Sequence, residues 1–394
     1  MAAGEALATR SDSVWSEQGT TPDAIEAALR ELLVQVHSEH EEYVPARVLN
    51  MIAFVDREWS GEIANRLRGV GRYHASRLLV LAYEPRRERL DARVTIVSEG
   101  ASAPGGLALL RETVVVELGE RHLDDLLTIA DPLVVTDLPT LLWSPHGHHE
   151  IVAELLALAQ AVLVDSVEEP VAQEALTRAC ELSDHAYVVD LAWLRSTPWR
   201  ERLAATFDPV WLRRELGMIT GVTVRHHPAS TAAAALLVGW LSSRLGWRTG
   251  SLVSDGGALV GATQTGDHDV AVHLEVAPEL QVPGLEAVEL DTASGMHLRL
   301  NRGRGGLRAY TRDSDGEERE WTLPGASRGE AGVLGEGIRQ ALLRDPTYLP
   351  ALKAAREMLA PADERRAAPA HRSTIGQRPS HAGPSIEDRP ATQS

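Results

Sequence analysis

The chain has 394 residues, enough for about two domains with a sizeable buried core. Its 39 basic and 56 acidic residues give a net charge of −17, so a phosphate backbone would be repelled and nucleic acid is not expected as a partner. The single cysteine, Cys180, excludes an intrachain disulfide. Because no signal-peptide pattern and no apolar stretch of membrane-spanning length is visible, we expect a cytoplasmic protein without membrane contact.

The first half of the chain predicts a β-α-β beginning. Thr21 as N-cap, Pro22 at the first helical position and the apolar spacing after them indicate a helix over 22–39. Strand-like runs follow at 47–55 and 77–83, with a helix between them that begins near Trp59. Further strand-like runs are expected at 94–98, 113–118, 133–135, 141–143 and 161–164. The first two of these favour a hairpin or an edge pair, and the others alternate with helices.

The second half begins with a further α/β cycle and then changes to a pattern of short strands. A long apolar helix is expected over 230–245, and Gly246 is a suitable stop for it. Before it, the cycle is expected to comprise a helix to 182, a strand-like run at 186–193, a helix at 198–207 and a strand at 222–224. After it, antiparallel strands are expected at 271–276, 287–290, 296–300 and 307–311, and helices at 331–343 and 348–359.

These elements predict an α/β fold. It consists of two α/β units with a mostly parallel or mixed sheet, followed by a smaller antiparallel β segment and a C-terminal helix. The predicted divisions are a disordered N-terminus at 1–20, an N-terminal α/β domain at 21–165, a C-terminal α/β domain with antiparallel strands at 166–360 and a disordered tail at 361–394. In the alternative, one sheet runs through both α/β halves, and the antiparallel segment from about residue 265 is the second unit.

The familiar cofactor and catalytic motifs are incomplete. Gly69 and Gly71 lack the third glycine of a dinucleotide-binding turn and follow a helix instead of preceding one. The histidines of 146–149 could meet a metal, but their spacing fits no familiar ligand set. Asp165 and Asp190 each close an apolar run, where a carboxylate serves as a helix cap or as part of a ligand site. We therefore assign no catalytic, cofactor-binding or metal-ligating residue, and expect no cofactor.

Long segments of the chain resemble one protein family. They include VLNMIAFVDREWSGEIANRLRGVGRYHASRLLVL (48–81), DLPTLLWSP (137–145) and DLAWLRSTPWRERLAATFDP (190–209). They resemble the OpcA family of glucose-6-phosphate dehydrogenase assembly proteins, in particular its actinobacterial branch, over about residues 21–355. The resemblance implies a non-catalytic protein that binds glucose-6-phosphate dehydrogenase, promotes its active oligomeric state and supports NADPH formation in the oxidative pentose phosphate pathway. The redox control associated with cyanobacterial relatives is not expected here, because Cys180 is alone.

Tryptophan and arginine are enriched where protein surfaces bury one another, and several lie inside the family-like segments. The candidate partner contacts are Arg72, His74, Arg77, Trp143, His146, Trp193, Arg195, Trp199 and Arg200. Trp193 and Trp199 could instead belong to the core. A different class of function remains open: an α/β sugar-phosphate-binding enzyme or metabolite sensor, with Arg72, Arg195 or Arg225 as phosphate ligands. A scaffold for some other partner is a third alternative.

Overall fold

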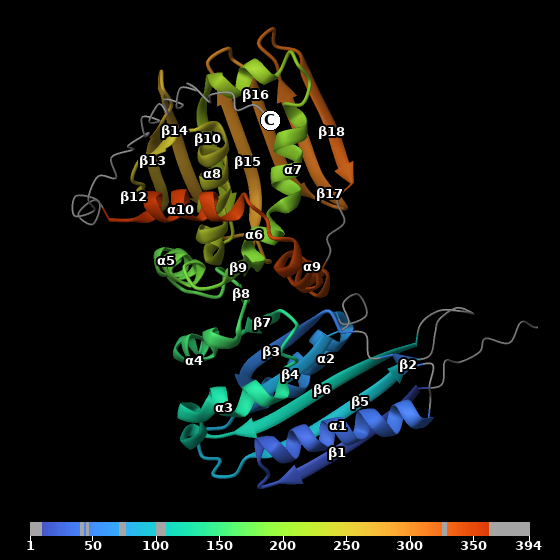
Figure 1. The fold of residues 1–394 in the computed structure, drawn as a ribbon. Helices are drawn as coiled ribbons and strands as arrows, with labels where there is room; N and C mark the ends of the chain where they lie inside the picture. The colour runs from blue at the N-terminus through green and yellow to red at the C-terminus, as the bar shows by residue number, and fades with distance from the viewer. Residues whose placement is uncertain are drawn as a thin grey trace, which may run out of the picture. The chain divides into compact units, whose positions relative to one another are not determined.

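Two nine-stranded sheets carry the fold (Figure 1). The computed structural model describes residues 10–39, 43–44, 47–70, 76–99, 108–324 and 329–361. The first sheet comprises β1 (Arg10–Gln18), β2 (Tyr43–Val44), β3 (Leu49–Asp56), β4 (Ser76–Tyr83), β5 (Asp91–Glu99), β6 (Ala108–Leu118), β7 (Thr140–Trp143), β8 (Ala161–Val164) and β9 (Tyr187–Asp190). The second comprises β10 (Ile219–His226), β11 (Arg248–Thr249), β12 (Val253–Asp255), β13 (Ala258–Gln264), β14 (Asp269–Val276), β15 (Leu285–Thr292), β16 (His297–Gly303), β17 (Gly306–Arg312) and β18 (Glu318–Pro324).

Helices connect and cover these strands. The α-helices are α1 (Pro22–Glu39), α2 (Ser60–Val70), α3 (Leu126–Ala130), α4 (His149–Leu155), α5 (Ala172–Ser183), α6 (Leu191–Arg195), α7 (Thr197–Thr206), α8 (Thr231–Leu245), α9 (Gly329–Leu343) and α10 (Tyr348–Leu359). Short 3-10 helices are η1 (Arg57–Trp59), η2 (Glu120–Asp125), η3 (Asp131–Leu133), η4 (Leu156–Leu158), η5 (Arg213–Met218) and η6 (Pro228–Ser230). Within the described residues, no helix is both long enough and apolar enough to cross a membrane.

The first sheet has a parallel centre and an antiparallel margin. Its strand order is β1-β5-β6-β4-β3-β7-β8-β9, and every neighbouring pair from β6 to β9 is parallel. β3, with the sequence LNMIAFVD, is buried except for Asp56, as expected for a parallel strand that is covered on both faces. β5 and β1 then extend the β6 margin with antiparallel pairing. The α/β class with a mixed sheet is confirmed.

The second sheet is antiparallel apart from one pair. Its order is β11-β13-β14-β10-β15-β16-β17-β18, and only β10 and β14 run parallel among the described strands. The predicted antiparallel segment and C-terminal helix are thus confirmed. In β14 buried and exposed residues alternate, because one face of the sheet packs inward and the other faces solvent.

Helix α8 packs on the second sheet and against α10. Its residues from Ala232 to Val238 are buried on every side, which explains its apolar sequence. A β-carbon built on Gly239 would lie 2.3 Å from the carbonyl oxygen of Ala351, so only glycine permits this approach of α10. Gly246 ends the helix in the left-handed conformation with φ 71°, as its sequence position predicted.

Helix α1 follows its sequence prediction closely. It spans Pro22–Glu39, and the Thr21 hydroxyl accepts a hydrogen bond from Ala24 N at 3.3 Å, which is the expected N-cap contact. Ile25 and Leu29 are buried where the helix packs on β5. The local signals of cap and periodicity were therefore sufficient to locate it.

Three expectations need correction. The N-terminus was expected to be disordered to residue 20, but Arg10–Gln18 forms β1, because it pairs along its whole length with β5 and Trp15 packs against the core. The strand expected at 133–135 is absent from the described chain, where Asp131–Leu133 forms the 3-10 helix η3 with Pro132 in its first turn. The first sheet also continues beyond the expected boundary at Asp165, because β9 pairs with β8. Residues to Ala360 form one compact unit.

Candidate functional site

The first sheet reverses its direction of winding between β3 and β7. From β3 the chain builds β4 and then β6 on one side, and later adds β7, β8 and β9 on the other. Open α/β sheets bind ligands at such a switch point, outside the carboxyl ends of the two strands. Here those ends are Asp56 of β3 and Trp143 of β7.

A histidine–aspartate pair and two aromatic rings lie at this switch point. His148 Nε2 lies 3.0 Å from Asp56 Oδ1, and its ring centroid is 5.0 Å from that of Phe54 and 5.9 Å from that of Tyr83. His148 adopts the left-handed conformation with φ 53°, which is strained for a residue with a β-carbon. The Asp56 contact and the ring packing hold it there. The sequence pattern did not predict this pair, although Asp56 closes an apolar run as Asp165 and Asp190 do.

The strand order implies a dinucleotide, but the residues present do not fit one. A dinucleotide site places glycines and a helix N-terminus against the pyrophosphate. In this chain the connection from β3 to α2 is the 3-10 turn of Arg57–Trp59, and it carries the Asp56 and Glu58 carboxylates and the Trp59 indole. Two carboxylates repel a pyrophosphate and the indole takes up space that a glycine would leave open. The switch point therefore does not support nucleotide chemistry.

Helix α9 covers the neighbouring strand ends. It contacts β8, β9, α6 and α2. A β-carbon built on Gly337 would lie 3.0 Å from Leu163 Cδ1 and 3.2 Å from Leu191 Cδ2, so the helix backbone packs directly on these side chains. The chain's own C-terminal part therefore packs on a side chain of β8 and on the start of α6.

A buried carboxylate lies at the end of β9. Asp190 is 1% exposed and accepts hydrogen bonds from Ser166 N (3.1 Å), Ser166 Oγ (2.5 Å), Ala192 N (2.9 Å) and the Tyr348 hydroxyl (3.3 Å). It caps α6 and ties α10 to the first sheet. Burial, followed by the charge of Asp165, raises the pKa of Asp190 from 3.8 to about 6, against the opposing effect of the Ser166 hydrogen bonds. Burial and Asp190 in turn raise the pKa of Tyr348.

Asp190 is expected to make the protein less stable as the pH rises from 4 to 7. Because its pKa is raised on folding, the folded state binds the proton more tightly, and this stabilisation is lost as the carboxyl ionises through about pH 6. A pKa shift of this size corresponds to about 3 kcal/mol of unfolding free energy. Asp190→Asn should remove this decline. Urea unfolding at pH 4 and pH 7.5 measures it, and an equal pH dependence in the variant and the wild type would contradict the assignment.

The tryptophan and arginine side chains expected at a partner surface are instead packed together inside. Trp193 is 2% exposed, its Nε1 donates to Asp345 Oδ2 at 2.9 Å, and its ring lies 5.5 Å from that of Tyr348. The Arg200 guanidinium carbon lies 3.3 Å from the Trp193 ring centroid, and Arg200 Nη1 donates to the Trp193 carbonyl at 2.7 Å. Burial lowers the pKa of Arg200 to about 10. This cluster joins α6 and α7 to the segment before α10.

The structure accounts for the other sequence candidates in different ways. Arg77 is buried with its Nε 2.7 Å from Glu112 Oε2, and Arg195 Nη2 lies 2.7 Å from Asp165 Oδ2. His146 is exposed, with its ring 5.8 Å from that of Trp59, and the partial burial of the ring lowers its pKa. Five candidates are buried and pack within the chain, which agrees with the core alternative for Trp193 and Trp199, and partner contact by these residues stays a prediction; they are Arg77, Trp143, Trp193, Trp199 and Arg200. Arg72 and His74 lie outside the described residues.

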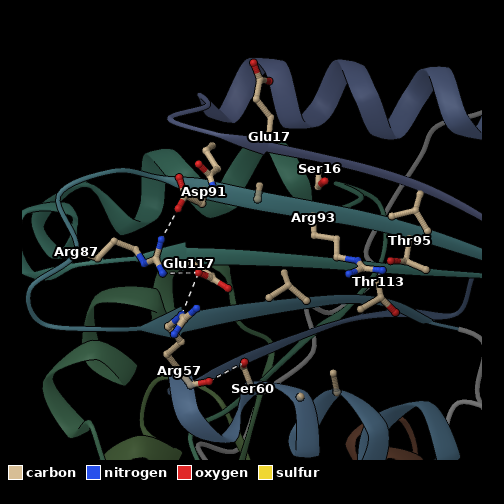
Figure 2. A pocket seen from close by; sticks show the side chains of 16 residues that line it. Ser16, Glu17, Arg57, Ser60, Arg87, Asp91, Arg93, Thr95, Thr113 and Glu117 are labelled. Carbon is tan, nitrogen blue, oxygen red and sulfur yellow. Dashed lines mark hydrogen bonds and ion pairs between the residues drawn. The ribbon is translucent and has the colours of Figure 1, made fainter.

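A cavity of about 720 Å³ lies beside α2, over β1, β5 and β6 (Figure 2). Ion pairs line one end of it: Arg57 Nε is 3.0 Å from Glu117 Oε2, Arg87 Nη2 is 2.5 Å from the same atom, and Arg87 also pairs with Asp91. Hydrogen bonding to Glu117, followed by its charge, raises the pKa of Arg57. Most of the charge at this end is therefore balanced within the chain.

The other end of this cavity is polar and open. Arg93, Ser16, Thr95 and Thr113 line it (Figure 2). Its guanidinium and hydroxyl groups can hydrogen-bond a carboxylate, a phosphate or a peptide backbone. These residues lie on the face of β1, β5 and β6 that lines the cavity.

A smaller cavity of about 450 Å³ lies at the carboxyl ends of β7 and β8. His149 and Arg178 both contact Glu169 there, with His149 Nε2 2.7 Å and Arg178 Nη1 2.8 Å from Glu169 Oε1. Burial, and then the charge of Arg178, lower the pKa of His149. In the part of the chain with defined placement, no group of three or more histidine, cysteine, aspartate or glutamate side chains is arranged to hold a metal ion.

The fold and two family models indicate the class and the family of this chain. The structure defines an α/β protein whose first sheet has the winding of a nucleotide-binding fold, with a switch point unsuited to nucleotide, followed by a large antiparallel sheet. A family model described as the glucose-6-phosphate dehydrogenase subunit N-terminal domain matches residues 68–181, and one described as the C-terminal domain of that subunit matches residues 186–352. Together they cover more than half of the chain. The chain belongs to the OpcA family.

Cyanobacterial relatives support the same assignment. The chain is 26% identical over 172 residues to a Synechococcus elongatus protein named as the OxPP cycle protein OpcA, covering 43% of this chain and 39% of that protein. A Nostoc punctiforme protein of the same name is 32% identical over 129 residues, which is 32% of this chain and 28% of the relative. A Synechocystis protein of that name is 31% identical over 119 residues, or 29% and 25%. The matches thus span about two fifths or less of these relatives.

Two solved structures of oxidoreductases show a weak likeness to this chain. One from Bacillus cereus has a TM-score of 0.43 at 11% identity and covers 78% of this chain and 93% of its own. An oxidoreductase domain protein from Kribbella flavida has a TM-score of 0.39 at 10% identity and covers 78% and 94%. Likeness at this level establishes no activity for this chain.

Proposed function

We propose that this chain is a non-catalytic accessory protein that binds glucose-6-phosphate dehydrogenase and promotes its active oligomeric state in the oxidative pentose phosphate pathway. The observation that carries this proposal is the pair of family matches over 68–181 and 186–352, both described as domains of a glucose-6-phosphate dehydrogenase subunit. A cytoplasmic location is part of the proposal, since the dehydrogenase and its substrates would have to be present there.

The geometry of the first sheet supports a binding role over catalysis. The segment that follows β3 at the switch point contains Asp56, Glu58 and Trp59 in place of a glycine-rich phosphate loop, and α9 contacts β8 and β9. Two of the three arginines considered as phosphate ligands are already paired, and the third, Arg72, lies outside the described residues. Arg195 contacts Asp165, and Arg225 lies within 3.9 Å of three glutamates, Glu275, Glu279 and Glu286. The metabolite-binding alternative is thus less well supported than the accessory role.

An assembly factor acts through a difference in affinity. It must bind the active assembly more tightly than the inactive one, because equal affinity shifts no equilibrium. A preference of about 1.4 kcal/mol would change the ratio of the two states about tenfold at saturation. The dehydrogenase rate should therefore reach a plateau as the concentration of this protein rises. With dehydrogenase in excess, the free form of this protein should be used up and only part of the enzyme activated.

Co-elution with the dehydrogenase tests the proposal. The purified chain and glucose-6-phosphate dehydrogenase from the same organism are mixed, run on a sizing column and assayed for dehydrogenase rate in the same fractions. We expect joint elution and a raised rate. Separate elution and an unchanged rate, with both proteins folded, would overturn the proposal. A thermal-shift screen with sugar phosphates tests the alternative, since saturable stabilisation of the isolated chain would favour a metabolite-binding function.

A further inference from the structure

The turn between α7 and η5 exposes two large apolar side chains. Val210 is 74% exposed and Trp211 is 72% exposed, the highest values among the large hydrophobic residues in the described part of the chain. They are adjacent at the tip of residues 208–214, which we call the 208–214 turn. Exposing an indole next to a branched aliphatic side chain leaves a large apolar area in water, and a tryptophan alone can bury 150–250 Å² in a contact.

This turn is held in shape from within. Leu212 N donates to the Pro209 carbonyl at 2.9 Å, and Arg213 Nε donates to the Asp208 carbonyl at 3.1 Å. Leu212 also packs against the core, so the base of the turn is anchored while its tip points outward. A contact loop that is already ordered loses less conformational entropy when it binds.

A buried glutamate fastens the end of the turn to the second sheet. Glu215 is 3% exposed, and its Oε2 accepts hydrogen bonds from Thr292 Oγ1 at 3.0 Å and from Ser294 Oγ at 2.5 Å. Both hydroxyls lie at the end of β15 or directly after it. The indole of Trp211 is therefore presented from a rigid scaffold.

The residue types on the turn are those that dominate the energy of protein interfaces. Tryptophan and arginine are enriched among hot-spot residues, and two arginines with exposed side chains, Arg213 and Arg214, follow Trp211 in the sequence. Trp193, Trp199 and Arg200 differ from these residues because their side chains are buried within the chain. The 208–214 turn provides an accessible set of the same chemistry.

We propose that the 208–214 turn is a docking element for glucose-6-phosphate dehydrogenase, with Trp211 and Val210 entering an apolar pocket of the enzyme whose rim accepts hydrogen bonds from Arg213 and Arg214. This inference rests on the proposed function, and it names the part of this chain that contacts the dehydrogenase. A second copy of this chain fits less well, because two chains of net charge −17 repel each other. A two-fold contact centred on Trp211 would also bring four guanidinium groups together.

Substitution at the tip tests this docking element in the full chain. Trp211→Ala is expected to weaken binding of the dehydrogenase about tenfold to a hundredfold, as for a hot-spot residue, with an unchanged melting temperature. Trp211→Phe should recover part of the affinity because it restores an aromatic ring. Val210→Ser should weaken binding, whereas Val253→Ser, at a valine on β12 that is 60% exposed, should not. Affinity is measured by biolayer interferometry with immobilised dehydrogenase.

The outcomes separate this inference from the function on which it rests. If the wild type binds and Trp211→Ala binds equally well, the docking element is wrong and the accessory function stands. If the wild type does not bind the dehydrogenase, the proposed function and this inference both fail. If Trp211→Ala instead dissolves a dimer of the chain seen by sizing chromatography and leaves dehydrogenase binding intact, the turn joins two copies and the proposal is overturned.

Discussion

Trp193→Ala is expected to lower the free energy of unfolding by about 3–5 kcal/mol, the range for removing a large aromatic side chain from a packed core. Trp193 is 2% exposed, so its removal leaves a cavity. It also removes the hydrogen bond to Asp345 Oδ2 and the aromatic face on which Arg200 lies. Arg200 would keep its charge in a site that has lost its principal packing partner. Urea unfolding followed by circular dichroism measures the change.

The matched control is Trp59→Ala. Trp59 is 44% exposed, so its removal should change the free energy of unfolding by much less, about 1 kcal/mol or below. Trp193→Phe should lie between the wild type and Trp193→Ala, because it keeps a ring but cannot donate to Asp345. Equal stability of Trp193→Ala and the wild type would contradict the packing role.

This result bears on how interface variants are interpreted. Loss of dehydrogenase activation in Trp193→Ala would follow from its lowered stability, because the side chain does not reach the surface. Trp211→Ala removes an indole that is 72% exposed and should leave stability intact. Comparing binding and unfolding for the two variants therefore distinguishes a structural tryptophan from a contacting one.

Local elements were predicted well because their signals are local. Thr21 and the apolar spacing located α1, and the apolar run ended by Gly246 located α8. β1 was missed because RSDSVWSEQ is polar and becomes a strand only through pairing with β5. The strand order could not be predicted from the sequence either, because it depends on which distant strands pair. The position of the switch point between β3 and β7 follows from that order.

Surface and core could not be separated by residue type. Trp193 and Arg200 lie close in sequence, as do Trp211 and Arg213, yet only the second pair is exposed. Arg200 is buried because the Trp193 ring, a carbonyl and a hydroxyl satisfy its guanidinium. That set of partners is assembled by the turn from α6 into α7 and leaves no periodic pattern in the sequence.

Glu112→Ala is expected to cost about 3–5 kcal/mol of unfolding free energy, because it leaves a buried arginine without its counter-charge. The Glu112 side chain is 1% exposed and pairs with Arg77 Nε at 2.7 Å and with Arg47. Arg77 and Glu112 are register partners on β4 and β6, in the parallel part of the first sheet. Arg77 Nη1 keeps its bond to the Leu133 carbonyl, but a carbonyl does not neutralise the charge.

A double substitution separates loss of the pair from loss of an isolated group. Arg77→Met combined with Glu112→Leu removes both buried charges and keeps much of the side-chain volume, so it should recover most of the stability lost in Glu112→Ala. Glu84→Ala is the surface control: Glu84 is 42% exposed beside Arg57, and its loss should cost about 1 kcal/mol or less. If Glu112→Ala costs no more than Glu84→Ala, the buried pair does not hold β4 and β6 together. Such a result would return Arg77 to the candidate partner contacts, since its guanidinium would then be able to leave Glu112 at little cost.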